Sequence, residues 1–427
     1  MLSGCGESRK DSSAPIKTSS NAVKPEAKDD ATTPTKKLDE TVTLEQTAKP
    51  TTDSQTSAAA PITKSDGADN FAETTQSTKE SQDAAVAAIK ELGGRVGFNP
   101  HRRWENNPVK PIMSVTCGSK VTDTDLVHLK GMSRLQYLAL NRTSVTDAGL
   151  VHLKGLASLE TLDLTDTSVT GAGLIHLQEL MSLRYLNLTD TSVTDAELIH
   201  LKGLTSLKTL ILYKTKVADA GLIHLKGMTS LQKLGLIGTK VTDDGLEHLK
   251  GLTSLESLGL NGTQVTDAGL LHLKGLPSLQ GLTLGNTGVT DAGLAHLKDM
   301  TSMKGLLLGS GVTDAGLVHL KGMTSMKGLT LTYTKVSDSG LTYLKGMTSL
   351  QFLWLSSTQV SDAGLVHLKE MTSLKTLWLS STQVSDAGLV HIKDLTNLKS
   401  LDLSKTNVTA AGVKDLQSAL PKCKISK

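Results

Sequence analysis

Hydrophobic positions return every 24 residues along most of this chain. In residues 145–168, Leu150 and Leu153 lie three apart, as on one face of a short helix, whereas Leu162 and Leu164 lie two apart, as on one face of a strand. The pattern predicts twelve helix–strand units over residues 121–407 and a closing fragment over 408–427. A valine opens each unit, with a single step of 23 residues before Val312: Val121, Val145, Val169, Val193, Val217, Val241, Val265, Val289, Val312, Val336, Val360, Val384 and Val408.

The polar residues of a unit predict where its elements begin and end. Thr146 and Asp147 favour the start of a short helix, and Lys154 followed by Gly155 favours its end. Thr167 is expected to bond the backbone at the turn after the strand. Since no single unit can bury its leucines, the units must stack. The fold class is therefore an α/β solenoid, with a parallel sheet on the concave face and short helices on the convex face.

The residues before the repeats divide into two parts. Residues 6–80 are rich in Ser, Thr, Lys, Asp, Ala and Pro and poor in apolar residues, so we expect a disordered tether. Over residues 81–120 we expect an N-terminal cap. Its helix is predicted from the spacing of Ala84, Val86, Ile89 and Leu92, and the letters RVGF predict a short strand after the Gly93–Gly94 stop.

The unit L-x-x-L-x-L-x-x-T-x-V-[TS]-D-A-G-L-x-H-L-K-G resembles the 24-residue leucine-rich repeats of bacterial, planctomycete-type surface and lipoprotein-like proteins. It is also similar to the repeats of eukaryotic F-box substrate receptors. The resemblance extends over residues 82–427, and Leu416, Leu420 and Ile425 are expected to close the core at the end. It implies a horseshoe that binds a partner, whose identity depends on the variable positions.

Composition and motifs narrow the class of function. Basic and acidic residues number 45 and 42, for a net charge of +3, so no nucleic-acid partner is indicated. Aromatic residues make up 3% of the chain, so leucine must fill the core. Three scattered cysteines predict neither a disulfide framework nor a zinc site, and no catalytic or cofactor motif occurs. We expect a monomeric, non-enzymatic protein without a cofactor or a metal.

Histidine recurs at one repeat position, which invites a metal-binding or pH-sensing interpretation. A zinc site requires converging ligands, and a residue kept by the repeat usually belongs to the scaffold, so we expect each ring to pack between helices and to bond a carbonyl. A milder effect of pH on stability stays open. The position is held by His128, His152, His176, His200, His224, His248, His272, His296, His319, His367 and His391, with Tyr343 in one unit.

Outward strand positions that vary between units are the candidate binding site. Trp354 and Trp378 share one such position in adjacent strands, about 4.8 Å apart. Phe352 lies beside them and Tyr333 one strand before. These rings predict an exposed binding hot spot for a protein, a peptide or a glycan, or else a stabilising aromatic ladder. Further large side chains expected on this face are Ile211 and Tyr213.

Glycines gather in three neighbouring units, where the unit of 23 residues also lacks its turn threonine. They predict a flat, slightly bent floor beside the tryptophans, with neutral decay of one unit as the alternative. The glycines are Gly281, Gly285, Gly288, Gly305, Gly309, Gly311 and Gly328.

The letters LSGC, ending at Cys5, match the cleavage site of a lipoprotein signal. The charged and apolar segments that such a signal requires do not precede it, so we interpret residues 1–5 as the remnant of a signal whose start lies upstream. Cys5 is then the lipidation site, and the protein is anchored in the cell envelope through that lipid alone. A chance LSGC before an ordinary disordered terminus is the alternative for these letters. The alternative for the function is an intracellular adaptor or substrate receptor, which the lack of an F-box-like segment disfavours. The cluster His101, Arg102, Arg103 and Trp104 is either an exposed loop or a minor docking site.

Overall fold

The computed structural model describes residues 68–98 and 110–427, and side chains from residue 79 onward. One sheet of 15 strands runs through this part of the chain, in sequence order from β1 to β15. β1 and β2 are antiparallel, and every later neighbouring pair is parallel and in register. The strands are β1 Arg95–Phe98, β2 Ile112–Thr116, β3 Tyr137–Ala139, β4 Thr161–Asp163, β5 Tyr185–Asn187, β6 Thr209–Ile211, β7 Lys233–Gly235, β8 Ser257–Gly259, β9 Gly281–Thr283, β10 Gly305–Leu307, β11 Gly328–Thr330, β12 Phe352–Trp354, β13 Thr376–Trp378, β14 Ser400–Asp402 and β15 Lys424–Ser426.

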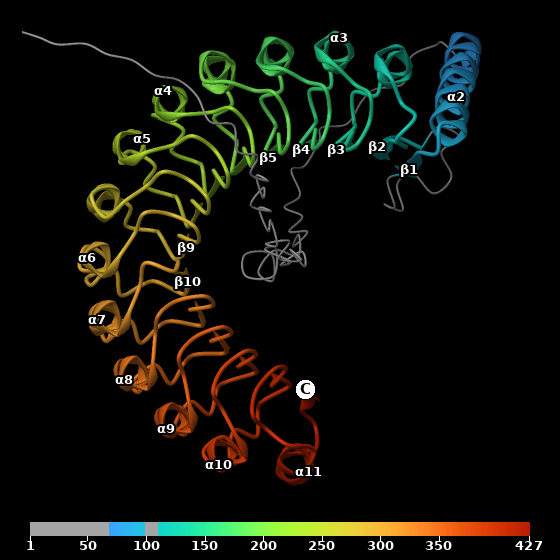
Figure 1. Cartoon of the computed structure of the whole chain (residues 1–427). Helices are drawn as coiled ribbons and strands as arrows, with labels where there is room; N and C mark the ends of the chain where they lie inside the picture. Colours follow the sequence, from blue (N-terminus) through green and yellow to red (C-terminus); the bar gives the residue numbers. More distant parts are fainter. Residues whose placement is uncertain (1–67, 99–109) are drawn as a thin grey trace, which may run out of the picture. The chain divides into compact units, whose positions relative to one another are not determined.

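Short helices cover the outer side of the repeats, while the strands line the inner side of the arc (Figure 1). The α/β leucine-rich repeat solenoid predicted from the sequence is therefore confirmed. The α-helices are α2 Ala68–Glu91, α3 Asp147–Leu150, α4 Asp219–Leu222, α5 Asp243–Glu247, α6 Asp291–Leu294, α7 Asp314–Leu317, α8 Asp338–Leu341, α9 Asp362–Leu365, α10 Asp386–Leu389 and α11 Ala410–Ala419. The 3₁₀ helices are η2 Asp123–Leu129, η3 Val151–Leu153, η4 Gly171–Leu177, η5 Ala196–Leu201, η6 Ile223–Leu225, η7 Gly269–Gly275, η8 Val318–Leu320, η9 Thr342–Leu344 and η10 Val366–Leu368.

Leucine columns fill the space between helices and strands. Leu150 and Leu153 on the helical side and Leu162 and Leu164 on the strand side are all fully buried. Because each such side chain contributes about 1.5–3 kcal/mol on burial, the columns stabilise the array mainly through contacts between neighbouring units.

The caps close the two ends of the core. β1 is the predicted RVGF strand, and α2 ends at Glu91, before Gly93 turns the chain at a φ of 79°. However, α2 begins at Ala68, within the segment for which we expected no regular structure, because Ala, Glu, Gln and Lys there favour a helix. Ala85, rather than the predicted Ala84, is the buried alanine of α2.

At the other end, the expected closing residues meet the core. Leu416 and Leu420 are buried, and Ile425 of β15 packs against the core while remaining half-exposed.

Turn threonines behave as the sequence predicts. Thr167 Oγ1 donates to the carbonyl of Leu164 at 2.7 Å, three residues earlier. The same bond recurs at Thr143, Thr191, Thr215, Thr239, Thr263, Thr287, Thr334, Thr358, Thr382 and Thr406. The short unit lacks this threonine, yet β9, β10 and β11 stay paired in register, so the sheet continues through the deletion.

Aspartates link each unit to the next. Asp219 Oδ1 accepts from the backbone N–H of Thr242 at 2.8 Å, and its Oδ2 accepts from Thr242 Oγ1 at 2.7 Å. Thr242 in turn caps the N-terminus of α5. Equivalent bonds, to the hydroxyl, the N–H or both, are made by Asp123, Asp147, Asp195, Asp243, Asp267, Asp291, Asp314, Asp338, Asp362 and Asp386.

Candidate functional site

The candidate site is a group of three aromatic side chains on neighbouring strands of the concave sheet. Register pairs Trp354 of β12 with Trp378 of β13, as predicted, and places Thr330 and Asp402 on the strands that flank them. The ring centroids of Trp354 and Trp378 are 5.5 Å apart with the planes tilted by 56°, and Phe352 stacks on Trp354 at 6.1 Å and 24°. The three rings therefore form one packed group, which we call the aromatic cluster.

The two tryptophans differ in exposure. Trp378 is 36% exposed, whereas Trp354, which contacts both other rings, is only 7% exposed. The expectation that both tryptophans lie open on the face is therefore wrong for Trp354. Its buried Nε1 has no hydrogen-bond acceptor among the described residues. Trp354 therefore supports the other two rings, and Trp378 is the tryptophan that a ligand can contact.

Tyr333 lies outside the aromatic cluster. It sits in the turn that follows β11, with its backbone at a φ of 64° and its side chain 63% exposed. Within the described residues, no ring contact joins it to the tryptophans. It can contact a ligand at the edge of the sheet but does not support the cluster.

Ile211 and Tyr213 form a second patch, six strands away. The Tyr213 ring and the Ile211 side chain lie over Gly235, where a Cβ would collide with the ring. Six strand spacings of about 4.8 Å put this patch roughly 29 Å from the aromatic cluster. The structure thus separates residues that the sequence had assigned to one site.

The glycine positions between the two patches leave the sheet bare next to the aromatic cluster. Gly305 has no heavy atom within 4 Å of the position that its Cβ would occupy, and at Gly328 the nearest is the Phe352 Cβ at 3.9 Å. One outward position in each of β10 and β11 thus lacks a side chain, whereas Leu307 and Thr330 fill the other, so the flat floor expected from the sequence is limited to these two glycines.

The histidine column is half-buried on the helical side of the repeats. One histidine of this column forms a hydrogen bond with another side chain: His200 Nδ1 bonds with Gln178 Nε2. The expected bonds to carbonyls do not occur in the part of the chain that the structure describes. Over residues 79–98 and 110–427, no group of three His, Cys, Asp or Glu side chains is arranged to hold a metal ion.

Two thiols are buried in the caps. Burial raises the pKa of Cys117 to about 12, with a further contribution from the charge of Asp125, and burial also raises the pKa of Cys423. Neither thiol is therefore an available nucleophile near neutral pH. Cys5 and the cluster His101, Arg102, Arg103 and Trp104 lie outside the described residues.

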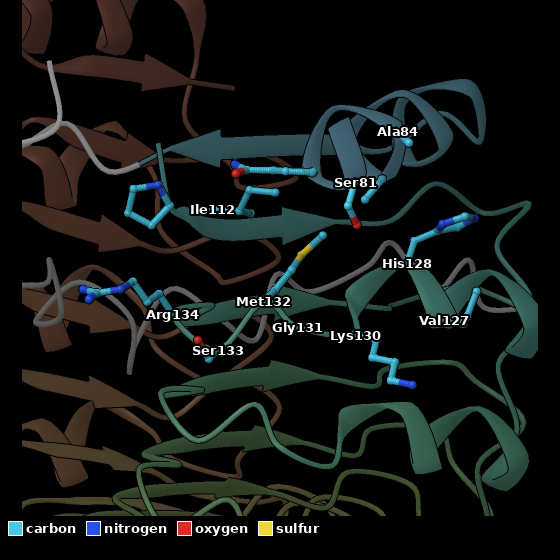
Figure 2. A pocket seen from close by; sticks show the side chains of 13 residues that line it. Ser81, Ala84, Ile112, Val127, His128, Lys130, Gly131, Met132, Ser133 and Arg134 are labelled. Atoms are coloured by element: carbon cyan, nitrogen blue, oxygen red, sulfur yellow. The ribbon is translucent and has the colours of Figure 1, made fainter. Parts of the chain in front are cut away.

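A cleft that the sequence did not predict lies between α2 and the first repeat (Figure 2). Its volume is about 760 Å³, and its lining includes Ala85 and Ile112, together with His128, Lys130 and Arg134. The cleft arises because the long helix α2 packs where the other repeats have a short helix. The 24-residue pattern within one repeat does not reveal this difference.

Comparisons with known proteins agree with this architecture. A family model described as leucine-rich repeat matches residues 394–416. An internalin from Listeria monocytogenes is 27% identical, with a TM-score of 0.56 over 74% of this chain and 86% of that chain. A leucine-rich repeat protein from Leptospira interrogans, 17% identical, shares the fold with a TM-score of 0.50 over 73% of this chain and 82% of that chain. A search of curated proteins found no match.

This chain is a leucine-rich repeat protein, structurally similar to bacterial internalins. The finer resemblance, to planctomycete-type lipoproteins, stays a prediction. Among the described helices, none is both long enough and apolar enough to span a membrane.

Proposed function

We propose that this chain is a non-enzymatic interaction protein that binds a protein or peptide on its concave sheet, with the aromatic cluster as the anchor. The observation that carries the proposal is the 36% exposed Trp378, whose ring lies against Trp354, which is itself stacked on Phe352. A large ring already fixed by its neighbours loses little conformational freedom on binding, which is how interface hot spots gain affinity.

Capture experiments on a Trp378→Ala variant test this proposal. The full chain is immobilised, proteins from the source organism are captured, and the bound fraction is quantified by mass spectrometry. Loss of a hot spot weakens binding by at least about 2 kcal/mol, or about 30-fold. The control is Tyr137→Ala, which removes a similarly exposed ring from β3. Equal capture by both variants would contradict the proposal.

A buried position separates binding from folding. Trp354→Ala should lower the free energy of unfolding by about 3–5 kcal/mol, because Trp354 is almost fully covered. Trp378→Ala should leave thermal unfolding close to that of the parent protein. If Trp378→Ala is as destabilising as Trp354→Ala, the aromatic cluster is scaffold.

The proposal includes a location, the cell envelope, through a lipid on Cys5. It is supported by the LSGC letters and by the Ser/Thr-rich composition of the residues that follow. Intact mass of the native protein in membrane and soluble fractions tests it. A chain that begins at Cys5 with acyl mass supports the anchor, whereas an unlipidated soluble chain favours the intracellular adaptor.

A further inference from the structure

We infer that the segment bound at the aromatic cluster is an extended acidic peptide, which lies across β9–β14 with its carboxylates facing a row of lysines. This inference rests on the proposed function and adds the chemical class of the ligand. It depends on the lysine row, on the two glycines beside it and on the neighbouring aromatic cluster.

A row of lysines crosses the carboxyl-terminal half of the sheet, which we call the lysine row. It consists of the residue directly before β10, β11, β13 and β14: Lys304, Lys327, Lys375 and Lys399. Backbone bonds of 2.8 Å run from Lys327 N to Lys304 O and from Lys399 N to Lys375 O, with Gln351 linking the two pairs. The four cations therefore lie at the starts of four of the five strands from β10 to β14, with neighbouring strands roughly 5 Å apart.

The lysine row is not neutralised within the described residues. None of its members forms an ion pair there, and Lys375 Nζ donates to Gln351 Oε1 at 2.9 Å. The same position in the amino-terminal half carries both signs, and there Arg184 pairs with Glu160 at 3.7 Å. The carboxyl-terminal half thus has a one-sided positive edge, which attracts an anionic partner.

Two positions between the lysine row and the ends of the strands have no side chain. Thr330, Trp354 and Trp378 end their strands three residues after the lysine row position. Between these residues and the lysines, β10 and β11 carry Gly305 and Gly328, whereas β12 and β13 carry Phe352 and Thr376. With no side chain at the glycines, an extended chain can approach the sheet closely. Asp402 beside Trp378 is the acidic exception on β14, and it accepts a bond from the Ser404 N–H at 3.0 Å.

Two buried donors on this face require acceptors. Thr283 Oγ1 in β9 and Trp354 Nε1 in β12 have no hydrogen-bond partner among the described residues, and both side chains are 7% exposed. Buried polar groups are nearly always paired in complete assemblies. Both atoms have almost no accessible surface, so they do not define the ligand.

A single-stranded nucleic acid fits less well, although lysines and aromatic rings can also bind one. Stacking of bases needs an open ring face for each base. Here Trp354 is covered by Phe352 and Trp378, so the rings of the cluster pack mainly against one another and leave little open face for a base. A carboxylate-bearing peptide needs the cations and a single anchor.

The test starts from selection of peptides on the immobilised full chain. The four spacings from β10 to β14 cover about 19 Å, or about six extended residues, so a random library of about ten residues is suitable. We expect enrichment of Asp and Glu next to an apolar residue. The affinity of one enriched peptide, labelled with fluorescein, is then measured by anisotropy.

Charge reversal on one face or the other tests the location. In the lysine row, Lys304→Glu, Lys327→Glu and Lys399→Glu are combined. The matched control combines Lys298→Glu, Lys321→Glu and Lys393→Glu, exposed lysines of the helical side in the same units. The first variant should bind at least about tenfold more weakly and lose salt dependence, while the control stays within about twofold of the parent protein.

Each outcome separates this inference from the proposed function. Selected peptides without acidic enrichment that still depend on Trp378 would overturn the acidic class alone. Peptides that bind the lysine-row variant, the control variant and Trp378→Ala equally well would overturn both. An oligothymidylate that binds more tightly than any selected peptide, and is lost in the lysine-row variant, would replace the peptide with a nucleic acid.

Discussion

In most units, an aspartate follows the threonine or serine at the start of the helix and bonds to the neighbouring unit. Asp386 Oδ1 accepts from the Thr409 N–H at 2.7 Å, and its Oδ2 accepts from Thr409 Oγ1 at 2.6 Å. The hydroxyl and the N–H of Thr409 favour the charged carboxylate and lower the pKa of Asp386 below its ordinary value. A surface carboxylate is therefore part of the interface between α10 and α11.

This carboxylate gives the last junction a defined pH dependence. Because the pKa of Asp386 is lower in the folded state than in the unfolded state, its stabilisation is complete above the unfolded value and is lost as pH falls through the folded value. We expect Asp386→Asn to be less stable than the parent protein at pH 6, with the difference shrinking below about pH 4. Urea unfolding at several pH values measures it.

The control for this experiment is Asp394→Asn, whose side chain accepts no hydrogen bond within the described residues. It should follow the parent protein throughout. A difference between Asp386→Asn and the parent that stays constant down to pH 3 would mean that charge on Asp386 does not stabilise the junction.

At the scale of single residues, the sequence predicted well which side chains are neighbours on the sheet, but it predicted poorly which of them are buried. The period of 24 places Trp378 next to Trp354, and the register confirms it. That Trp354 is covered while Trp378 is not depends on how three rings tilt against one another, which strand alternation does not determine. The same limit explains Tyr333. The sequence places it one strand before the tryptophans, but it lies in the turn after β11 and makes no ring contact with them.

At the scale of the helical element, one junction is built differently from the others. The usual aspartate is replaced by Gly171, and the usual glycine of the following unit is replaced by Glu197. Glu197 fills the space that a side chain at position 171 would occupy, and its Oε2 accepts from Thr194 Oγ1 at 2.6 Å. The two departures compensate, because a carboxylate from the other side of the junction reaches the Thr194 hydroxyl.

The first repeat follows the same rule. No preceding unit offers an aspartate to Thr122, and Asp125 stands at the position that is glycine in most later units. Asp125 Oδ2 accepts from the Thr122 N–H and from its Oγ1, both at 2.8 Å, and these bonds lower the pKa of Asp125. The repeat pattern alone did not predict the Gly171–Glu197 pair or the role of Asp125, because each becomes apparent only when two neighbouring units are compared.

A double-mutant cycle tests the compensation. Gly171→Asp alone should cost about 1–3 kcal/mol by overpacking against Glu197. Glu197→Gly alone should cost about 1 kcal/mol through the lost bond to Thr194. The double variant recreates the junction found elsewhere, so its free energy of unfolding should approach that of the parent protein. Additive losses in the double variant would show that the two positions do not interact.

Elements themselves were predictable to different degrees. Strands of three residues follow from leucines two apart, and every unit has one. The helical side was predicted as short helices, but its division into α-helical and 3₁₀ turns depends on packing against the neighbouring unit. The start of α2 at Ala68 could not be read from apolar spacing, because its first turns carry few apolar residues.

Across the whole repeat array, each unit bonds and packs against its neighbours alone. Strand pairing joins consecutive strands throughout, and the aspartate bonds bridge consecutive units. Stability of such an array is a sum of unit and interface contributions, so a local defect should spread only a few units. The concave site on β9–β14 therefore depends on the carboxyl-terminal cap more than on the amino-terminal repeats.

Damage to the carboxyl-terminal cap measures this dependence. Leu416 in α11 is 3% exposed, and Leu416→Ala should cost about 2–4 kcal/mol locally. Hydrogen exchange should accelerate in β13 and β14 and remain unchanged in β3–β6, whereas Lys414→Ala on the exposed side of α11 should change neither. Acceleration of equal size in every strand would instead show that the array unfolds as one cooperative unit. The proposed site would then be coupled to the amino-terminal cap as strongly as to its own.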